Sequence, residues 1–298
     1  MELKSWIHAA RLRTLPLSLS GIIVGSFVAY KQGFWDASIF TLSMLTTLFL
    51  QILSNFANDL GDSYKGADSE GRVGPVRAIQ SGKISQKGMT IGTVIMSMLS
   101  LATAIPLIII GTDGMPSSVL WAYVVLALLS VLAAVTYTVG KKAYGYNGMG
   151  DVMVFIFFGL VSVLGVYSLY SKQFDWSLLG LAYGIGLLSI AVLNLNNMRD
   201  HENDKRVNKK TLVVAMGFEK AKIYHTSLII GSFIGILTFI FVNEWWLSLI
   251  ALLPYIVLIK HLLKVWKTDV PQTLDPELKK VALSTFMISI LFLISTIL

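Results

Sequence analysis

The sequence has few charged residues and no cysteine. Of its 298 residues, 14% are Asp, Glu, Lys or Arg and 55% are hydrophobic, whereas soluble domains carry about 25% charged residues. This shortage, with a mean hydropathy of +0.70, places the chain among membrane proteins. The absence of cysteine excludes disulfides, thiolate nucleophiles and zinc–thiolate sites. The four histidines are too scattered for a His-rich metal site: His8, His201, His225 and His261.

Long apolar runs predict an all-α membrane protein with about nine transmembrane helices. A helix needs roughly 20 apolar residues to cross the hydrocarbon. Runs without Lys, Arg, Asp or Glu lie near residues 15–30, 38–57, 89–111, 117–139, 152–170, 177–197, 224–242, 245–259 and 281–298. No strand-like alternation competes with them, so we do not expect a β-barrel. We expect one domain over residues 1–298, embedded in the lipid bilayer.

Lysine and arginine predict the orientation of these spans. Nearly all of them lie in loops on one side, near residues 4–13, 65–87, 141–142, 199–222 and 260–280, and the other side receives only Lys31 and Lys172. Because cytoplasmic loops carry the excess of positive charge, we expect an inner-membrane protein with a cytoplasmic N-terminus and an external C-terminus. This distribution accounts for the net charge of +7 without a nucleic-acid partner. No obligate protein partner is expected.

Residues 1–14 are expected to form an amphipathic lead helix at the membrane interface. In this stretch Trp6 and Ile7 are set against the basic residues Lys4, Arg11 and Arg13. A cleaved signal peptide is the alternative, because a basic start precedes an apolar run. The run continues to position 31 without a small-residue cleavage pattern, which favours the interfacial helix.

Two clusters of amides and carboxylates begin where the second and sixth spans end. The first comprises Asn55, Asn58, Asp59 and Asp62, and the second comprises Asn196, Asn197, Asp200 and Asp204. Such groups are expensive in lipid and usually face a bundle interior or a wet cavity. The four-residue spacing within each cluster places oxygen atoms along one helix face. A charged loop exposed to solvent is the alternative explanation. The occurrence of such a cluster after both spans favours a binding site instead.

Crowded carboxylates repel one another and take up protons unless a cation lies between them. Mg²⁺ fits, because it binds through a few carboxylates together with substrate phosphates. The basic residues Arg77, Lys209 and Lys210 are placed to reach phosphate oxygens. Acidic and basic groups at one membrane face therefore indicate a metal–diphosphate site, in loops near residues 58–88 and 198–222.

The two clusters also predict an internal repeat. We expect two four-helix halves around a central cavity, with the polar site between them and one extra helix. Membrane transporters place their sites at such repeat interfaces, so an ion or anion transporter remains an alternative function.

With these motifs, the chain resembles the UbiA superfamily of membrane prenyltransferases. Within that superfamily it is most similar to the branch that prenylates 1,4-dihydroxy-2-naphthoate in menaquinone synthesis. The resemblance covers almost the whole chain. It is carried by ARLRTLP at 10–16, NFANDLGDSYKGAD at 55–68, GPVRAIQSG at 74–82, VFIFFG at 154–159, NNMRDHEND at 196–204 and KKTL at 209–212.

The resemblance implies Mg²⁺-dependent transfer of a polyprenyl group from a polyprenyl diphosphate to dihydroxynaphthoate, with decarboxylation to demethylmenaquinone. It implies that the diphosphate binds through magnesium to Asn58, Asp59, Asp62, Asp200 and Asp204. Arg77 and Lys209 would neutralise diphosphate oxygens. The residues that would support the site are Asn55, Asn197 and Arg199. The cavity walls would be lined by Tyr137, Phe155, Phe157 and Phe158. Another aromatic acceptor, such as 4-hydroxybenzoate, is the alternative within the superfamily.

The sequence departs from the family pattern at two places. Residues 137–142 read YTVGKK where relatives often have a Gly-Pro pair, so the loop on the acceptor side is expected to differ. Asn208 stands where a glycine commonly precedes the motif lysine, which affects the expected backbone rather than the chemistry.

Overall fold

The computed structural model describes residues 3–66 and 76–298. Within these ranges, nine helical segments are long and apolar enough to cross a membrane, which confirms the predicted all-α membrane fold. They are Leu3–Lys31, Ala37–Lys65, Gln86–Gly111, Ser117–Thr136, Gly150–Ser171, Trp176–Arg206, Phe218–Val242, Trp246–Lys267 and Pro271–Ile297. The internal repeat of two four-helix halves stays a prediction.

Several spans combine more than one helical element. Four consist of one α-helix each: α3 (Ala37–Lys65), α4 (Gln86–Gly111), α5 (Ser117–Thr136) and α10 (Phe218–Val242). The first contains α1 (Leu3–Ala10) and α2 (Leu15–Lys31), and the fifth contains α6 (Gly150–Val154), a π-helical segment (Phe155–Gly165) and α7 (Val166–Ser171). In the sixth, eighth and ninth, a short 3-10 turn precedes α8 (Leu179–Arg206), α11 (Tyr255–Lys267) and α12 (Asp275–Ile297). The short helix α9 (Leu212–Met216) precedes α10.

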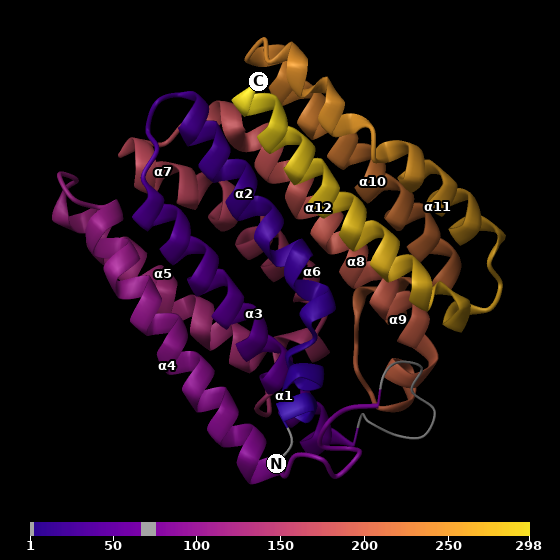
Figure 1. Ribbon diagram of the computed structural model, residues 1–298. Coiled ribbons are helices and arrows are strands. Elements are labelled where there is room, and N and C mark those ends of the chain that lie inside the picture. Colours follow the sequence, from indigo (N-terminus) through magenta and orange to yellow (C-terminus); the bar gives the residue numbers. More distant parts are fainter. Residues whose placement is uncertain (1–2, 67–75) are drawn as a thin grey trace.

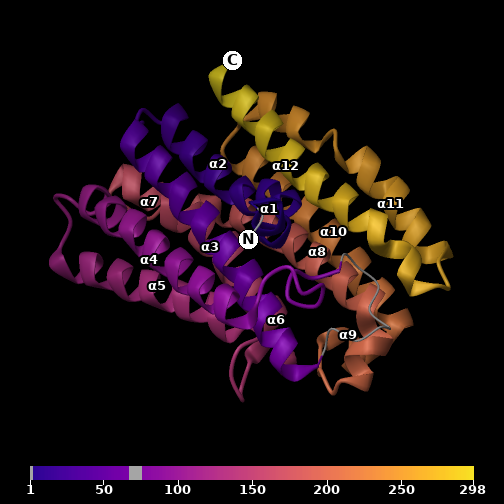
Figure 2. The ribbon, with the colours of Figure 1, turned by 60° about the horizontal axis from the view of Figure 1, so that its bottom comes forward.

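Two groups of helices face each other across the bundle (Figure 1). On one side lie α3, α4 and α5, and on the other lie α8, α10, α11 and α12. Helix α2 packs against both α3 and α12, so the first and last spans are neighbours. We call the end where α3 and α8 terminate and α12 begins the motif end, and Figure 2 brings this end forward.

The lead helix α1 is separated from α2 by a sharp break. At the break, Arg11 has a left-handed backbone with φ of 50°. The ring of Trp6 meets Phe56 of α3 edge-on, with 5.3 Å between ring centroids, and Ala9 and Ala10 are buried. The break therefore lets α1 pack over the motif end instead of continuing the first span.

The acidic clusters lie on helices rather than in loops. The expected spans ended at residues 57 and 197, but α3 continues to Lys65 and α8 continues to Arg206. Gly66 ends α3 in a left-handed conformation with φ of 64°, and its amide donates to the carbonyl of Asp62. The clusters thus occupy the last turns of two long helices, which fixes their side chains more firmly than a loop would.

Helices α8 and α10 pack against each other through a pair of facing glycines. A Cβ atom on Gly180 would lie 2.5 Å from the carbonyl oxygen of Gly235, and one on Gly235 would lie 2.7 Å from the carbonyl oxygen of Gly180. Both distances are too short for any carbon–oxygen contact, so the two backbones approach directly. Small residues allow this kind of approach between membrane helices.

We predict that Gly235→Ala lowers the thermal stability of the purified protein, because the added methyl group must push α10 away from α8. Overpacking of this kind costs about 1–3 kcal/mol. Gly165→Ala is the matched control, since a Cβ atom there meets its nearest neighbour at an ordinary 3.6 Å. Equal melting temperatures for both variants in detergent would contradict direct backbone contact between α8 and α10.

Candidate functional site

A chamber of about 1000 Å³ lies inside the bundle and reaches the motif end. Its charged part is formed by the ends of α3, α8 and α12, and its remaining walls are mostly apolar, including Leu101, Leu107, Leu126 and Leu169. Along α5 and its C-cap residue, the lining residues run from Tyr123 to Tyr137, which is roughly 20 Å of helix rise. The chamber therefore joins a charged compartment to a long apolar one.

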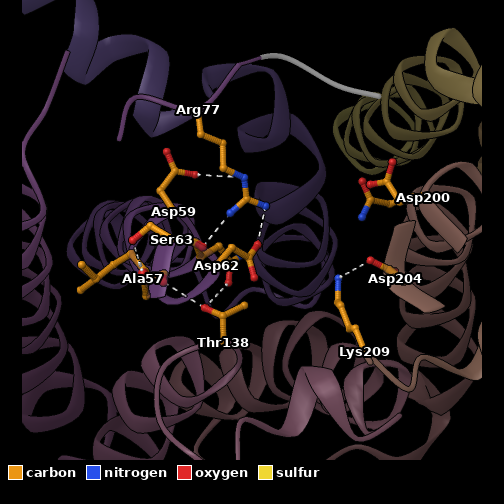
Figure 3. A network of polar contacts seen from close by, with 12 residues as sticks. Ala57, Asp59, Asp62, Ser63, Arg77, Thr138, Asp200, Asp204 and Lys209 are labelled. Carbon is orange, nitrogen blue, oxygen red and sulfur yellow. Dashed lines mark hydrogen bonds and ion pairs between the residues drawn. The ribbon is translucent and has the colours of Figure 1, made fainter. Parts of the chain in front are cut away.

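The first acidic cluster is paired with arginine. Asp59 and Asp62 are only 1% and 4% exposed. Arg77 points between them, with its Nη2 2.5 Å from Oδ2 of Asp62 and its Nε 3.8 Å from Oδ1 of Asp59 (Figure 3). Arg11, from the break after α1, forms an ion pair with Asp59. Two arginines from separate segments thus compensate the two buried carboxylates.

Hydrogen bonds fix this cluster to its surroundings. The Nη1 of Arg77 donates to the carbonyl of Asn58 over 2.7 Å. Thr138, just after α5, donates to Oδ1 of Asn58 over 3.2 Å. Asn55 donates to the carbonyl of Ala10 over 2.9 Å, which holds the break beside α3. Asn55 and Asn58 therefore connect α3 to the lead helix and to the end of α5.

Tyr146 joins the two acidic clusters. Its hydroxyl donates to Oδ1 of Asp62 over 2.5 Å, and the Nζ atoms of Lys65 and Lys209 lie 3.7 and 5.6 Å from the centre of its ring. Burial and the adjacent Asp62 carboxylate raise the pKa of Tyr146 above its ordinary value. Burial likewise raises the pKa of Tyr137. Tyr146 therefore remains a hydrogen-bond donor at any physiological pH.

In the second cluster, Asp200 is held by its neighbour Arg199. Nε and Nη2 of Arg199 donate to the two carboxylate oxygens of Asp200 over 2.8 and 2.6 Å. Nη2 also donates to Oδ1 of Asn196 over 2.7 Å, and Nη1 donates to Oδ1 of Asp275 over 2.5 Å. The guanidinium group is thus fixed on three sides, and the orientation of Asp200 depends on it.

Asp204 is paired with Lys209 across a tight turn. The Nζ of Lys209 lies 3.4 Å from Oδ1 of Asp204, and its backbone amide donates to the carbonyl of Asp204 over 2.7 Å. Asn208 allows the turn by adopting a left-handed backbone with φ of 55°. Asparagine tolerates this conformation better than most residues. The departure from glycine at this position therefore preserves the backbone that presents Lys209.

The residues present fit magnesium bound together with a phosphate ligand. Within residues 3–66 and 76–298, no three His, Cys, Asp or Glu side chains are grouped closely enough to hold a metal by themselves. Magnesium instead uses one or two carboxylates plus substrate phosphates. Figure 3 shows Asp59 and Asp62 on one side, and Asp200 and Asp204 on the other. Oδ2 of Asp204 is buried without a hydrogen-bond partner, and such an oxygen is available to a cation.

Most residues singled out in the sequence meet at this chamber. Those that line it are Asn55, Asn58, Asp59, Asp62, Arg77, Tyr137, Arg199, Asp200, Asp204 and Lys209. Asn197 is not among the lining residues, because the adjacent position, Asn196, occupies the chamber face of α8. Positions 67, 68, 74 and 75 of the quoted motifs lie outside the described residues.

Three contributors were not assigned to the site from the sequence, and a fourth, Asn196, belonged to the second cluster without a role of its own. Arg11 and Tyr146 contact the carboxylates of the first cluster, and Asn196 and Asp275 contact Arg199. Arg11 belongs to the motif at 10–16, and Asn196 shares a helical row with Asp200, so both carried a sequence signal. Tyr146 and Asp275 lie far from either cluster in sequence, and only the fold brings them in.

The π-helical segment shapes the apolar wall. A π-helix carries its hydrogen bonds from residue i to i+5, which is rare and often functional. In this segment Phe157 and Phe158 both line the chamber, although they are adjacent in sequence. Phe155 was also expected on the wall, but its ring packs edge-on against Tyr183 of α8, with 5.9 Å between centroids. Two aromatic rings, not three, therefore border the apolar compartment from this segment.

The sequence matches the UbiA prenyltransferase family over residues 18–289. It is 41% identical over 295 residues to 1,4-dihydroxy-2-naphthoate octaprenyltransferase of Haemophilus influenzae, covering 98% of this chain and 95% of the relative. The enzyme of the same name from Escherichia coli is 37% identical, with 98% of this chain and 94% of the relative covered.

Two solved structures share the fold. A digeranylgeranylglyceryl phosphate synthase superposes with a TM-score of 0.62 at 18% identity, covering 99% of this chain and 98% of that one. A UbiA homologue from Archaeoglobus fulgidus, bound to DMAPP and Mg²⁺, gives a TM-score of 0.54 at 20% identity, with 96% and 97% covered.

We predict that Arg77→Ala weakens the binding of inorganic pyrophosphate in the presence of Mg²⁺ at least tenfold, as measured by calorimetry. A hydrogen bond from a charged donor is worth about 1.5–3 kcal/mol. Arg77→Lys keeps the charge but loses the planar fork, so it should bind with intermediate affinity. The exposed Lys83→Ala, in the same segment, serves as the control and should bind like the wild type. Unchanged binding by Arg77→Ala would contradict a role at an anion site.

Proposed function

The chain belongs to the UbiA prenyltransferase family, and we propose that it transfers a polyprenyl group from a polyprenyl diphosphate to 1,4-dihydroxy-2-naphthoate. Two whole-length relatives, 41% and 37% identical, carry the name of a 1,4-dihydroxy-2-naphthoate octaprenyltransferase. The observation that best supports the reaction is one chamber in which two acidic helix ends, each paired with basic residues, open into a long apolar compartment.

The charged compartment suits a diphosphate held with magnesium. Asp59 and Asp62 would contribute carboxylate oxygens from one side, and Asp200 and Asp204 from the other, with Asn58 in support. When bound, magnesium would neutralise diphosphate oxygens and stabilise the charge that develops on the leaving group. This use of the metal is supported by the Archaeoglobus fulgidus homologue, which is bound to DMAPP and Mg²⁺.

Departure of the diphosphate is the step that Arg77 and Lys209 serve. The allylic carbon–oxygen bond breaks, and its electron pair stays on the diphosphate oxygen. Preorganised cations at the position where negative charge develops usually make the largest catalytic contribution. Arg77 is already fixed by Asp62 and by the carbonyl of Asn58, so little reorganisation is needed. Lys209 is held from the opposite side by Asp204.

The allylic cation left behind must be kept from water until the acceptor reacts. Phe157 and Phe158 border the apolar compartment, where aromatic faces stabilise positive charge. The electron-rich ring of dihydroxynaphthoate then attacks with a pair of ring electrons, forming a carbon–carbon bond at the carbon that bears the carboxylate. Loss of that carboxylate as carbon dioxide returns its bonding pair to the ring, and the product is demethylmenaquinol, the reduced form of demethylmenaquinone.

We place the protein in the cell inner membrane, with the motif end on the cytoplasmic side. The basic residues collect at this end, as the positive-inside rule requires. A soluble acceptor and a charged diphosphate would approach from the cytoplasm, while the polyprenyl tail would lie in the apolar compartment and the lipid.

We predict that purified protein in lipid forms a prenylated, decarboxylated product from dihydroxynaphthoate and a polyprenyl diphosphate when Mg²⁺ is present. EDTA should abolish the reaction, and 4-hydroxybenzoate should be a poor acceptor. Asp59→Ala should lower turnover at least about a hundredfold while the protein still folds, because a preorganised electrostatic contact is lost. Asp113→Ala, at an exposed site outside the chamber, is the matched control.

Mass spectrometry of the extracted lipids would identify the product in each arm. Efficient transfer to 4-hydroxybenzoate instead of dihydroxynaphthoate would overturn the acceptor assignment. Ion flux across the membrane without any prenylated product would overturn the transferase assignment and favour a transporter.

A further inference from the structure

The ninth span reaches the charged compartment through Asp275, the first residue of its long helix α12. Asp275 begins α12, is half-exposed and lines the chamber, and its Oδ1 accepts from Nη1 of Arg199 over 2.5 Å. Helix α12 packs beside α8 and α2 (Figure 1). A carboxylate from the last span therefore meets the second acidic cluster, 75 positions further along the chain than Asp200.

Arg199 transmits this contact to Asp200. The guanidinium group is buried, at 3% exposed, and its Nη1 has Asp275 as its partner. Its Nε and Nη2 hold both oxygens of Asp200, and no other hydrogen bond to the Asp200 carboxylate is found among the described residues. A carboxylate offers about four lone-pair positions. Arg199 thus occupies one position on each oxygen and determines where the remaining ones point.

The start of α12 is itself firmly held. Glu277, two residues after Asp275, is fully buried and accepts from Lys280 over 2.7 Å, and Lys264 lies 3.1 Å from it. Its other oxygen lies 2.8 Å from Nδ1 of His261 in α11. His261 in turn lies 2.8 Å from His225 in α10. Contacts from α11, itself supported by His225 of α10, therefore fix the helix turn that presents Asp275.

We propose that Asp275 is a positioning residue for the metal–diphosphate site. It fixes the guanidinium group of Arg199, which in turn orients Asp200 so that its free lone pairs face the metal. The ninth span, which lies outside the two expected four-helix halves, would thereby complete the site rather than merely pack beside it. This inference rests on the proposed function, because it assigns Asp200 to the metal.

Arg199 depends on Asp275 because its guanidinium group is buried. If Asp275 is removed, Nη1 loses an ionised acceptor in a place that water reaches poorly, and the guanidinium group is free to turn away from Asp200. Loss of the hydrogen-bonding partner of a metal ligand typically weakens metal affinity by 10–100-fold. Asp275 contacts Asp200 only through Arg199, so we expect its removal to weaken metal affinity by about tenfold, at the lower end of this range.

The test compares Asp275→Ala, Asp275→Asn and the exposed Asp269→Ala, which lies six residues earlier and is the matched control. Binding of Mn²⁺ in the presence of inorganic pyrophosphate is measured by electron paramagnetic resonance, and transfer rates are measured over a Mg²⁺ titration. We expect about tenfold weaker Mn²⁺ binding and a matching rise in half-saturating Mg²⁺ for Asp275→Ala, with little change in the maximal rate. Asp275→Asn keeps one acceptor oxygen and should recover most of the affinity.

A double-mutant cycle tests the route through Arg199. In an Arg199→Gln background, Asp275→Ala should weaken Mn²⁺ binding no further, because its effect passes through the missing side chain. Additive effects, or an Asp275→Asn variant as weak as Asp275→Ala, would overturn the positioning role. Unchanged Mn²⁺ binding in Asp275→Ala would also overturn it. Absence of prenyl transfer in the wild type would instead refute the proposed function, so the two failures are distinguishable.

Discussion

The polar end of this protein is built around buried carboxylates at the ends of two membrane helices. Each of these carboxylates needs a basic or hydrogen-bonding partner. An ionised Asp at the centre of a membrane helix costs roughly 2.5–3.5 kcal/mol on insertion scales. In the first cluster, Asp59 and Asp62 are paired with Arg11, Arg77 and Tyr146. In the second cluster, Asp200 is paired with Arg199 and Asp204 with Lys209. The partners come from the break after α1, the connections after α3, α5 and α8, and α8 itself. The connections at the motif end thus supply most of the side chains that compensate the buried carboxylates.

In the proposed function, the same pairing would prepare the chamber for a multiply charged anion. A carboxylate that binds a metal would do so through the lone pairs that its basic partner leaves free, and Arg77 and Lys209 would reach phosphate oxygens with their remaining N–H groups. The apolar compartment beyond serves the opposite requirement. Its wall includes a π-helical segment from which Phe157 and Phe158 line the chamber, where the proposed reaction would have to keep water from a carbocation. One chamber thus combines a strongly polar end with an apolar one.

Composition and helical spacing predicted much of this arrangement. Nine spans and the two acidic rows follow from run lengths and four-residue spacing, because both depend on local sequence. The helix ends were placed too early, since polar residues at 58–65 and 198–206 look like loops until tertiary partners stabilise them. Tyr146 and Asp275 were missed for a related reason: an isolated Tyr or Asp carries no periodic signal. The choice of Asn196 over Asn197 at the chamber depends on a helix rotation that sequence spacing only suggests.

A structure with bound ligands tests the central claim most directly. The protein would be solved with Mn²⁺ and an unreactive thiodiphosphate analogue of the prenyl donor, and the metal located by its anomalous scattering. Metal density between the ends of α3 and α8, within coordination distance of at least one carboxylate from each, with the prenyl chain extending past Phe157, is the expected result. Metal bound to only one helix end, or a diphosphate outside the chamber, would contradict a site shared by the two acidic clusters.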